Sequence, residues 1–522
     1  MSETLSEPMS QALRGPDAHT EAAHGFQWEE FERLQTRLAP LFRHVFADPA
    51  APRCVVVVPG LSLDAEVLAK VSGARFYEER MLSMLMLLRF PNTKLVFVTS
   101  SPIDPAIVDY YLGLLPGVPG AHARKRLVML NAHDASALSL TEKILRRPRL
   151  LARIRQAVDD RTNAHLSVFN ATVLEAKLAC LLGIPMYACD PRLGYWGSKS
   201  GSRDSFRRAG IELPDGEEQL RDRQDVLQAL LDLRQRNPEL KRAVIKLEEG
   251  FSGDGNARIE LARLPVSRNG GRGIEVLLES IEPEAAGMQA EEYLSKFDQL
   301  GGIVESWLEG EQVRSPSVQV RINPLREIEL ISTHDQVLGG RSGQVFLGSR
   351  FPADPRYRSD LHEAALRVAA VLRDQGVLGR FSIDFLHRQQ DGLGQLYAIE
   401  TNLRKGGTTL PFQMLQFLTA GRYQSDIGEF VTPLGQTRCY VASDNLQKAA
   451  YRRLGPEDLI DVLVQHRLHF DNTRQQGVVF NLIGALSEFG KLGLVSIADS
   501  LDLAQRQYDE VVDVLDRETA AG

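Results

Sequence analysis

Two neighbouring segments close to residue 400 alternate strictly between apolar and polar side chains, a pattern that commits this part of the chain to paired strands with one buried face. In RFSIDFLHR, residues 380–388, the apolar side chains fall on one face and Asp384 lies on the other. In YAIETNLR, residues 397–404, the alternation places on one polar face Ala398, Glu400, Asn402 and Arg404. The linker QQDGLGQ is polar and contains glycine, so it predicts a hairpin.

The polar face of this hairpin has the composition of a metal and phosphate site. Asp384 and Glu400 supply carboxylates and Asn402 supplies an amide oxygen, which are hard ligands that suit Mg²⁺ bridging phosphates. Arg404 beside them suits a developing oxyanion or an acyl phosphate. A strand with one face in water shows the same alternation, so the hairpin alone leaves both interpretations open.

Composition argues against several classes of protein. The 522 residues suggest about three domains, and the net charge of −7 argues against a nucleic-acid-binding protein, because no general basic excess exists to replace counterions. The four cysteines lack metal-ligand spacing and fit a reducing cytoplasm. Residues 1–25 lack the apolar core of a signal peptide, and the longest apolar run, residues 81–88, is too short to cross a bilayer. We therefore expect a cytoplasmic protein without membrane or nucleic-acid partners.

The first part of the chain alternates strands and helices. Apolar strand patterns stand at RCVVVVPG (53–60), KLVFVTS (94–100) and RLVMLNA (126–132), with a helical stretch at 75–89. The segment 171–191 has the pattern of a helix, a turn and a strand. This order predicts an open α/β sheet with parallel strands over residues 26–195, after a disordered tail at 1–25.

Residues 196–435 alternate short helices, strands and glycine-rich loops. Lys199 precedes a helix predicted over 203–209, and the strand AVIKL, residues 243–247, leads into the loop EEGFSGDGN. From 436 to 522 the pattern becomes mainly helical. The chain therefore divides into a middle region rich in strands and loops and a C-terminal region rich in helices.

Lys246 stands in the middle of an otherwise apolar strand, where an ammonium group is costly unless it meets an anion. The loop that follows holds Ser252, Gly253 and Gly255, whose backbone N–H groups suit phosphates. The loop matches neither the GxGxxG dinucleotide motif nor a Walker loop. Strand, glycine loop and strand is also the pattern of an ordinary hairpin, and Lys199 alone is also an ordinary surface lysine.

The segment VESWLEGE, residues 304–311, is a short apolar strand that runs into acidic and bulky residues. Glu305 and Glu311 suit hydrogen bonds from an adenine amino group and from ribose hydroxyls. Trp307 or Leu308 suits packing on an adenine ring. By itself the segment is a weak signal for one end of a nucleotide site.

The order of these parts resembles the ATP-grasp superfamily over residues 53–435. A lysine and helix, a strand with a lysine and a glycine loop, an apolar strand with glutamates, an aspartate strand and a Glu-x-Asn strand follow one another. SPSVQ, STHDQVLGG, SGQVFLG and NLRKGGTTLP look like the pheganomycin peptide ligase-like branch, as do YVASDNL and GVVFNLIGALSEFGKLG near the C-terminus. The branch is expected to have a histidine before Pro411, where this chain has Leu410, so the acceptor is expected to differ if that position touches substrate.

The resemblance implies an α/β fold with an α+β grasp. An N-terminal open α/β pre-ATP-grasp domain would span 26–195, an ATP-grasp domain of two α+β subdomains 196–435, and a mainly helical C-terminal domain 436–522. The C-terminal domain is a candidate for capping the acceptor site or for forming a homodimer.

The resemblance also implies an ATP-dependent carboxylate–amine ligase that forms a peptide-type bond through an acyl phosphate and releases ADP and phosphate. Its cofactors would be ATP and Mg²⁺, with Mn²⁺ as a substitute. Its partners would be a small-molecule or peptide carboxylate and an amine. Lys199 and Lys246 would bind the phosphates, the hairpin oxygens would hold the metal, residues 304–311 would form the adenine hinge, and Arg404 would be the catalytic residue that holds the acyl phosphate.

Three further residues are candidates for contact with substrate. His334 in STHDQ suits a substrate contact or a base, but a structural histidine fits the same pattern. Arg341 between glycines suits a substrate carboxylate. Arg380 begins the aspartate strand and is also consistent with a solvated arginine.

Three other functions remain in view. A phosphotransferase on the same nucleotide site would release a phosphorylated product without an amine. A regulatory protein would bind ATP without turnover, although the metal ligands and both lysines are all present. An NAD(P) oxidoreductase built on the first domain would need GxGxxG after RCVVVVPG, and this chain lacks it.

Overall fold

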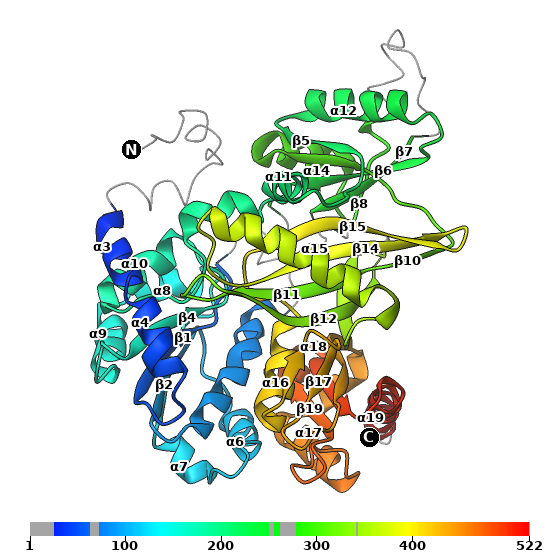
Figure 1. Ribbon diagram of the computed structural model, residues 1–522. Helices are drawn as coiled ribbons and strands as arrows, with labels where there is room; N and C mark the ends of the chain where they lie inside the picture. The colour runs from blue at the N-terminus through cyan, green and yellow to red at the C-terminus, as the bar shows by residue number, and fades with distance from the viewer. Residues whose placement is uncertain are drawn as a thin grey trace.

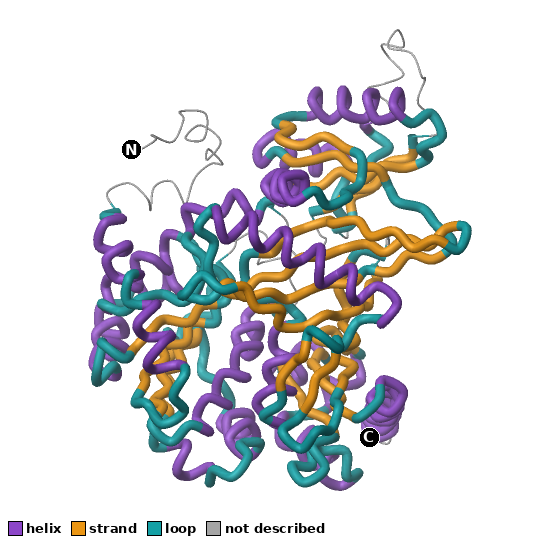
Figure 2. The backbone as a smooth tube through the Cα atoms, in the orientation of Figure 1, coloured by secondary structure: helices purple, strands orange, loops and turns teal. Residues whose placement is uncertain are grey.

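The computed structural model describes residues 26–62, 73–249, 255–261, 278–285, 287–340 and 343–520. The candidate residues Ser252, Gly253 and Arg341 and the expected tail at 1–25 lie outside these ranges. In Figure 1 the N-terminal region, in blue and cyan, lies at the lower left, a small green sheet lies at the top, and the C-terminal segment, in orange and red, lies at the lower right. A large sheet crosses the middle of the molecule, as the strands in Figure 2 show.

The N-terminal region is a parallel four-stranded sheet in the order β3-β2-β1-β4. Its strands are β1 (Arg53–Val58), β2 (Thr93–Thr99), β3 (Leu127–Asn131) and β4 (Ala164–Val168). Around it lie α3 (Trp28–Gln35), α4 (Leu38–Leu41), the π-helical η1 (Phe42–Phe46), α6 (Pro105–Gly113), α7 (Gly120–Arg124), α8 (Leu140–Leu145), α9 (Pro148–Ala157) and α10 (Val173–Leu182). Every residue of β1 is buried because apolar clusters cover both faces of the sheet. The expected open α/β sheet with parallel strands is confirmed.

The strand expected within 171–191 is the one element of this region that barely forms. The helix is present as α10, and Gly183 ends it in the left-handed conformation. After it, only an isolated parallel bridge joins Met186 to Leu166 of β4. The sequence interpretation did not single out β4 itself, although the turn-forming residues DDRTN stand directly before its short AHLSV pattern.

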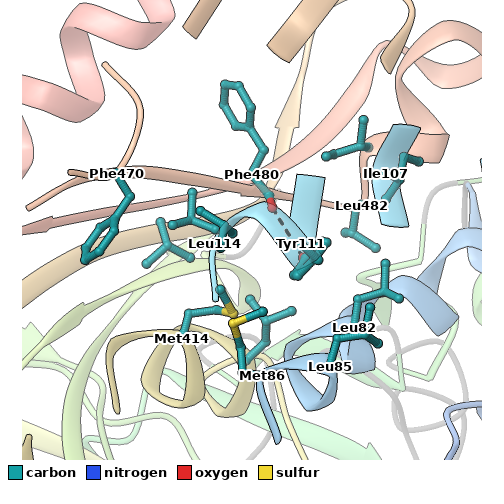
Figure 3. Packing of buried hydrophobic residues seen from close by; sticks show 14 of the residues in the cluster. Leu82, Leu85, Met86, Ile107, Tyr111, Leu114, Met414, Phe470, Phe480 and Leu482 are labelled. Carbon is teal, nitrogen blue, oxygen red and sulfur yellow. Dashed lines mark hydrogen bonds between the residues drawn. The ribbon is translucent and has the colours of Figure 1, made fainter. Parts of the chain in front are cut away.

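The helical stretch expected at 75–89 is a 3₁₀ helix, η2 (Ala74–Arg89), and nearly all of its residues are buried. It is buried because it packs between the N-terminal sheet and the C-terminal part of the chain. Figure 3 shows Leu82, Leu85 and Met86 of η2 facing Met414 and Leu482. Tyr111 of α6 donates a hydrogen bond to the carbonyl oxygen of Phe480 in the same cluster (3.3 Å). One continuous apolar core therefore joins the two ends of the chain.

The small sheet has five strands in the order β5-β9-β6-β7-β8. They are β5 (Gly216–Leu220), β6 (Arg242–Leu247), β7 (Asn256–Glu260), β8 (Glu282–Pro283) and β9 (Gly302–Ser306), and the helices beside them are α12 (Arg223–Arg236) and α14 (Ala290–Leu300). Strands β6 and β7 pair antiparallel, as the pattern around the glycine loop predicts. The side chains of α12 and α14 form one core with this sheet.

The large sheet has nine strands, and its main path runs β10-β14-β11-β12-β13-β18-β20-β19, with β15 paired to β14. The strands are β10 (Gln312–Arg314), β11 (Pro316–Ile322), β12 (Ile328–Gly339), β13 (Val345–Phe351), β14 (Gly379–Gln390), β15 (Leu393–Asn402), β18 (Cys439–Gln447), β19 (Gly477–Asn481) and β20 (Lys491–Ala498). A separate pair is formed by β16 (Arg422–Gln424) and β17 (Glu429–Val431). The helices of this part are α15 (Pro355–Asp374), α16 (Thr409–Thr419), α17 (Pro456–Gln465), α18 (Leu486–Phe489), α19 (Leu501–Ala520), and the 3₁₀ turns η4 (Ala449–Arg453) and η5 (Ile483–Ala485).

The C-terminal segment is rich in helix, as expected, but it also supplies three strands to the large sheet. Strand β18 pairs antiparallel with β13, with Phe351 opposite Tyr440. Strand β20 lies between β18 and β19. The sheet therefore runs across the domain boundary expected at residue 435. The boundary itself stays a prediction, because the sheet does not break there.

The hairpin of β14 and β15 forms as its alternation predicts, with the turn at Asp391 and Gly392, both at positive φ. One detail of the alternation is wrong. A bulge shifts the register so that Asp384 pairs with Glu400 while the next residue, Phe385, pairs with Ala398. Ala398 therefore joins the apolar core and not the polar face, because the extra residue at Ile399 reverses the alternation there.

The helix after the first lysine is longer than its expected range of 203–209. It is α11 (Lys199–Ala209), it follows the 3₁₀ turn η3 (Pro191–Gly197), and the side chain of Ser198 caps it by accepting a hydrogen bond from the backbone N–H of Gly201. Gly201 cannot carry a side chain here, because a Cβ atom would stand 1.8 Å from the carbonyl oxygen of Tyr195. This close approach fixes the first turn of the helix, and with it Lys199. Across the ranges that the structure describes, no helix has the length and apolar composition needed to cross a membrane.

Candidate active site

A cavity of about 1290 Å³ lies between the five-stranded and the nine-stranded sheets. From the small sheet it is lined by Val244, Lys246 and Glu305, and from the large sheet by Asp384 and Glu400. The residues that the sequence singled out from segments up to two hundred positions apart therefore meet in one space. This arrangement gives the predicted nucleotide, metal and reaction groups a common site.

The lysine of the small sheet is held by a buried carboxylate. Lys246 Nζ lies 2.6 Å from Oε2 of Glu305, and the guanidinium of Arg203 lies 2.5 Å from Oε1 of the same carboxylate. Burial alone would raise the pKa of Glu305, but the positive charges of Lys246 and Arg203 outweigh it and hold that pKa below its usual value. Glu305 is thus an ionised anchor for Lys246, and it is less available to an adenine amino group than its sequence position suggested.

The second lysine faces the metal-type carboxylates. Lys199, whose side chain is 8 % exposed, forms an ion pair with Oε1 of Glu400. Burial would raise the pKa of Glu400, and the charge of Lys199 reverses that effect, so the carboxyl stays ionised. Helix α11 brings Lys199 to this place because its first turn is tied to the small sheet by Glu248, which accepts from the backbone N–H and the hydroxyl of Ser200 (2.8 and 2.7 Å).

The carboxylates of Asp384 and Glu400 stand opposite each other on paired strands. Burial, followed by the neighbouring charge of Glu400, raises the pKa of Asp384 to about 6. Asp384 accepts hydrogen bonds from the amide groups of Gln336 (2.9 Å) and Asn402 (3.0 Å). Two adjacent anions that repel each other in a buried site are the electrostatic condition that a divalent cation relieves.

The donor set fits Mg²⁺ or Mn²⁺, because it consists of carboxylate and amide oxygens and contains no sulfur. The amide nitrogen of Asn402 donates to Asp384, which leaves its carbonyl oxygen as the atom suited to a cation. Within the described ranges there is no group of three or more His, Cys, Asp or Glu side chains that could hold a metal by itself. A cation at these residues would therefore need oxygens from a ligand such as the phosphates of a nucleotide.

Arg404 lies in the same cavity as these carboxylates. Burial lowers the pKa of its guanidinium, Glu400 and Asp384 raise it, and the nearby charge of Arg80 lowers it again. The charges of both carboxylates and of Arg80 therefore act on this guanidinium. Its position fits the predicted role of stabilising an acyl phosphate.

Only part of the predicted adenine hinge, residues 304–311, lines the cavity. Trp307 and Leu308 line the cavity, and the guanidinium of Arg242 lies 5.0 Å from the centre of the Trp307 ring. Glu309 lines the cavity and pairs with Arg242 (2.8 Å). Glu311 is exposed and is not among the lining residues. Of the loop candidates, Gly255 lines the cavity.

The two substrate candidates that the structure describes, His334 and Arg380, are not among the residues that line the cavity. His334 is fully buried and shares a hydrogen bond with the hydroxyl of Tyr440 (2.7 Å), and burial lowers its pKa to about 3. Arg380 donates to Gln319 (3.3 Å), and burial, followed by the charge of Arg321, lowers its pKa to about 10. Neither side chain lines the cavity, although both lie on strands that also carry lining residues, Gln336 on β12 and Asp384 on β14.

Several cavity residues were missed by sequence reasoning. Gln336, Phe346, Arg80 and Asp444 all line the cavity. Arg80 stands just before the apolar run at 81–88, and a charged residue beside a buried run was the available signal. Asp444 follows the apolar start of its strand in the same way. No local spacing connects the two, because they are 364 residues apart in the chain.

Comparison with protein families identifies two matches. The family described as IQCH-like, ATP-grasp matches residues 193–275 and 288–426. The PGM1 C-terminal domain matches residues 458–511. The first match covers both lysines and the hairpin, and the second lies within the C-terminal segment.

Two curated relatives extend along most of the chain. An L-propargylglycine--L-glutamate ligase from Streptantibioticus cattleyicolor is 30% identical over 478 residues, which cover 90% of this chain and 95% of that protein. IQ motif-containing protein H from Danio rerio is 21% identical over 545 residues, which cover 95% of this chain but 51% of that longer protein.

Solved structures share the fold at low sequence identity. A biotin carboxylase from Campylobacter jejuni has a TM-score of 0.53 and 13% identity, with 88% of this chain and 91% of that chain covered. The biotin carboxylase domain of the 2-oxoglutarate carboxylase from Hydrogenobacter thermophilus has a TM-score of 0.52 and 12% identity, with 88% and 89% covered. An N5-carboxyaminoimidazole ribonucleotide synthetase has a TM-score of 0.50 and 11% identity, with 89% and 98% covered.

Proposed function

The chain belongs to the ATP-grasp superfamily, in the branch of the carboxylate–amine ligases, and on this premise we propose that it joins an amino-acid or peptide carboxylate to an amine through an acyl phosphate. The reaction consumes ATP and releases ADP and phosphate. The name of the Streptantibioticus relative pairs L-propargylglycine with L-glutamate, which supports amino acids as the substrates of this chain.

One observation carries the proposal. Two lysines and two carboxylates from opposite sheets meet in one cavity, and Arg404 lies next to the carboxylates in the same space. Lys246 approaches from the small sheet and Lys199 from the helix beside it, so both can face the phosphates of one nucleotide. Trp307 and Leu308 supply an apolar wall for the base at the other end of the nucleotide.

The first step is phosphoryl transfer. A carboxylate oxygen of the donor forms a bond to the γ-phosphorus while the bond from that phosphorus to the bridging oxygen of ATP breaks, and ADP leaves with the electron pair. This step needs positioning and charge neutralisation more than a protein nucleophile. Lys199 and Lys246 would hold the phosphates in line, and Arg404 would hold the new acyl phosphate.

The second step forms the amide. The nitrogen of a neutral amine attacks the acyl carbon, the carbon–oxygen bond to phosphate breaks, and phosphate leaves with the electron pair while the amine loses its proton to water. Arg404 would stabilise the negative charge on the tetrahedral oxygen during this attack.

The metal ligands of this proposal are Asp384, Glu400 and Asn402. When bound there, Mg²⁺ neutralises phosphate charge, and Mn²⁺ is the substitute with the same preference for oxygen ligands. The ion pair with Lys199 keeps Glu400 ionised, and the amides of Gln336 and Asn402 orient Asp384. These contacts hold the carboxylates in place before any ligand arrives.

The experiment that tests the proposal measures release of ADP and phosphate from Mg²⁺-ATP. Carboxylates are offered with and without amino acids and peptides as amines, and products are analysed by mass spectrometry. We expect release that requires both partners, together with a condensed product that has lost one water relative to its two substrates. A donor treated with hydroxylamine in place of the amine should give a hydroxamate, which reports the acyl phosphate.

Two results would contradict the proposal. Phosphate transfer to a carboxylate or hydroxyl that yields a stable phosphorylated product without an amine would identify a phosphotransferase. Binding of ATP without turnover, for a panel that includes L-glutamate with each other proteinogenic amino acid, would indicate a regulatory nucleotide-binding protein.

A further inference from the structure

An ion pair between two segments far apart in the chain lies in the wall of the cavity. Arg80 of η2 pairs with Asp444 of β18, and their side chains are only 11 % and 13 % exposed. Both residues line the main cavity and also a small side cavity beside it, together with Phe346 and Leu410 for the side cavity. The position that differs from the expected family pattern, Leu410, therefore lies next to this pair.

The guanidinium of Arg80 is not fully used by its partner. Its Nε is buried and has no hydrogen-bond partner among the described residues. Its carbon atom lies 3.9 Å from the centre of the Tyr77 ring, which holds the plane of the guanidinium in place. A guanidinium that is held in place at the cavity wall is suited to a carboxylate, which accepts two parallel hydrogen bonds.

The pair lies next to the reaction groups. Arg80 and Asp444 line the same cavity as Arg404 and the carboxylates of Asp384 and Glu400, and the charge of Arg80 lowers the pKa of Arg404. A substrate held at this pair would place its reacting group within reach of the acyl phosphate site. At the nucleotide end the carboxylates of Glu305 and Glu400 are each bound to a lysine.

We infer that Arg80 and Asp444 bind the α-carboxylate and the α-ammonium group of an amino-acid substrate. This inference rests on the proposed function and names its substrate class. A zwitterion has one positive and one negative charge, so it can replace each partner of the ion pair by a new one and leave no buried charge without a counterion. A simple amine or a simple carboxylate can satisfy only one of the two side chains.

The same chemistry belongs to two substrates, the carboxylate donor and the amine acceptor. A donor amino acid would bind through its α-groups and react through a side-chain carboxylate. An acceptor amino acid would bind through its α-carboxylate and react through its nitrogen after that nitrogen loses a proton. Both are α-amino acids, and the test below separates them.

The experiment compares wild-type enzyme with Arg80→Met and Asp444→Asn. Each productive amino acid, found with L-glutamate and the panel of L-amino acids, is compared with its carboxamide, which keeps the ammonium group and lacks the carboxylate. In the wild type we expect the carboxamide to lose at least about 10²-fold in kcat/KM, because a site built for a charged group rejects an analogue that leaves it unpaired. In Arg80→Met this discrimination should fall to within about threefold, which a merely structural role of Arg80 would not cause.

Hydroxylamine identifies which substrate occupies the pair. If Arg80→Met forms hydroxamate from the donor at the wild-type rate but has a raised KM for the amino-acid acceptor, the pair binds the acceptor. If hydroxamate formation shows the raised KM for the donor, the pair binds the donor. Either result supports the inference.

The control variant is Arg75→Met. Arg75 lies on η2 and pairs with Glu488 of the C-terminal segment, but this pair is exposed and does not line the cavity. We expect its kcat/KM and its discrimination against the carboxamide to equal those of the wild type. Thermal unfolding of all variants with and without Mg²⁺-ADP shows whether the nucleotide end stays folded, and Arg80→Lys provides a milder change if Arg80→Met unfolds.

The inference fails if wild-type enzyme ligates amino acids while Arg80→Met or Arg80→Lys, folded and able to bind Mg²⁺-ADP, keeps the wild-type discrimination. It also fails if the wild type accepts the carboxamide as well as the amino acid. A wild type that ligates no carboxylate to any amine contradicts the proposed function first, so the two failures are distinguishable.

Discussion

The two ends of the cavity are built in different ways. The nucleotide end, formed by Lys199, Lys246, Glu305 and Glu400, takes its charged groups from the small sheet, the helix beside it and the hairpin of the large sheet. The opposite end takes Arg80 from the N-terminal region and Asp444 from the C-terminal segment. Both ends hold buried ion pairs, but only the first is made from motifs that can be identified along the sequence.

We attribute this difference to the two ligands. A nucleotide with its cation is common to many enzymes, whereas the substrate is particular to one enzyme. Phosphates and a divalent cation need lysines and oxygen ligands in a fixed arrangement, and short strands with local patterns supply it. A substrate site can be formed by any residues that the fold brings together. The nucleotide end should therefore respond to mutation through turnover and nucleotide affinity, and the opposite end through substrate choice.

The largest effect is expected at the metal ligands. Glu400→Gln removes a carboxylate that pairs with Lys199 and is proposed to hold the cation, so kcat should fall by at least about 10²-fold while the protein stays folded. Steady-state kinetics at saturating Mg²⁺ and circular dichroism provide the measurements. Glu311→Gln is the matched control, because Glu311 is exposed and outside the cavity lining. Full activity of Glu400→Gln would contradict the assignment of this end of the cavity to the nucleotide and its cation.

A smaller effect is expected for the buried lysine. Lys246→Ala should raise the KM for ATP, and the Kd for ADP, by about 10- to 100-fold, because one cation that faces the phosphates is lost. Glu305 keeps Arg203 as a partner, so the fold should survive. Lys241→Ala changes an exposed lysine just before the same strand and should leave both constants unchanged. An unchanged KM for ATP in Lys246→Ala would show that the phosphates lie elsewhere.

The smallest effect is expected at His334, which does not line the cavity, and it concerns the pH dependence of stability. Its pKa is lowered to about 3 by burial, and the unfolded chain has an ordinary histidine pKa near 6.5, so the unfolded state binds the proton first. Stability from this group is present above pH 6.5 and is lost as the pH falls from 6.5 towards 3. His334→Gln should reduce this acid sensitivity and lower stability at pH 7.5 by about 1 kcal/mol, through the altered contact with Tyr440.

Urea unfolding at pH 5.5 and 7.5 measures the effect of His334→Gln, with His122→Gln, an exposed histidine, as the control. The KM for ATP and the kcat of His334→Gln should stay near the wild-type values. A variant as stable as the wild type that lost turnover would show instead that His334 acts in catalysis, and the distinction between cavity wall and supporting sheet would no longer hold at this strand.

The residues proposed for the nucleotide end could be picked out of the sequence, and they meet in one cavity, because the patterns that carry them are local. The alternation in 380–388 and 397–404 is enough to place Asp384 and Glu400 on one face, since both sit on strands of the same hairpin. It could not place Ala398, because a bulge is a property of pairing and not of either strand. The contact of Arg80 with Asp444 depends on how η2 packs against the C-terminal segment, and nothing in either local sequence specifies it.

The continuity of the large sheet across residue 435 has a consequence for how this chain can be divided. Strand β13 is an inner strand only because β18 pairs with it. A chain cut after residue 435 would expose the backbone N–H and C=O groups of Val345–Phe351 as an open edge, and such edges recruit other chains. The C-terminal segment therefore protects the rest of the molecule against self-association, and a shortened chain should be recovered as aggregate rather than as a smaller soluble enzyme.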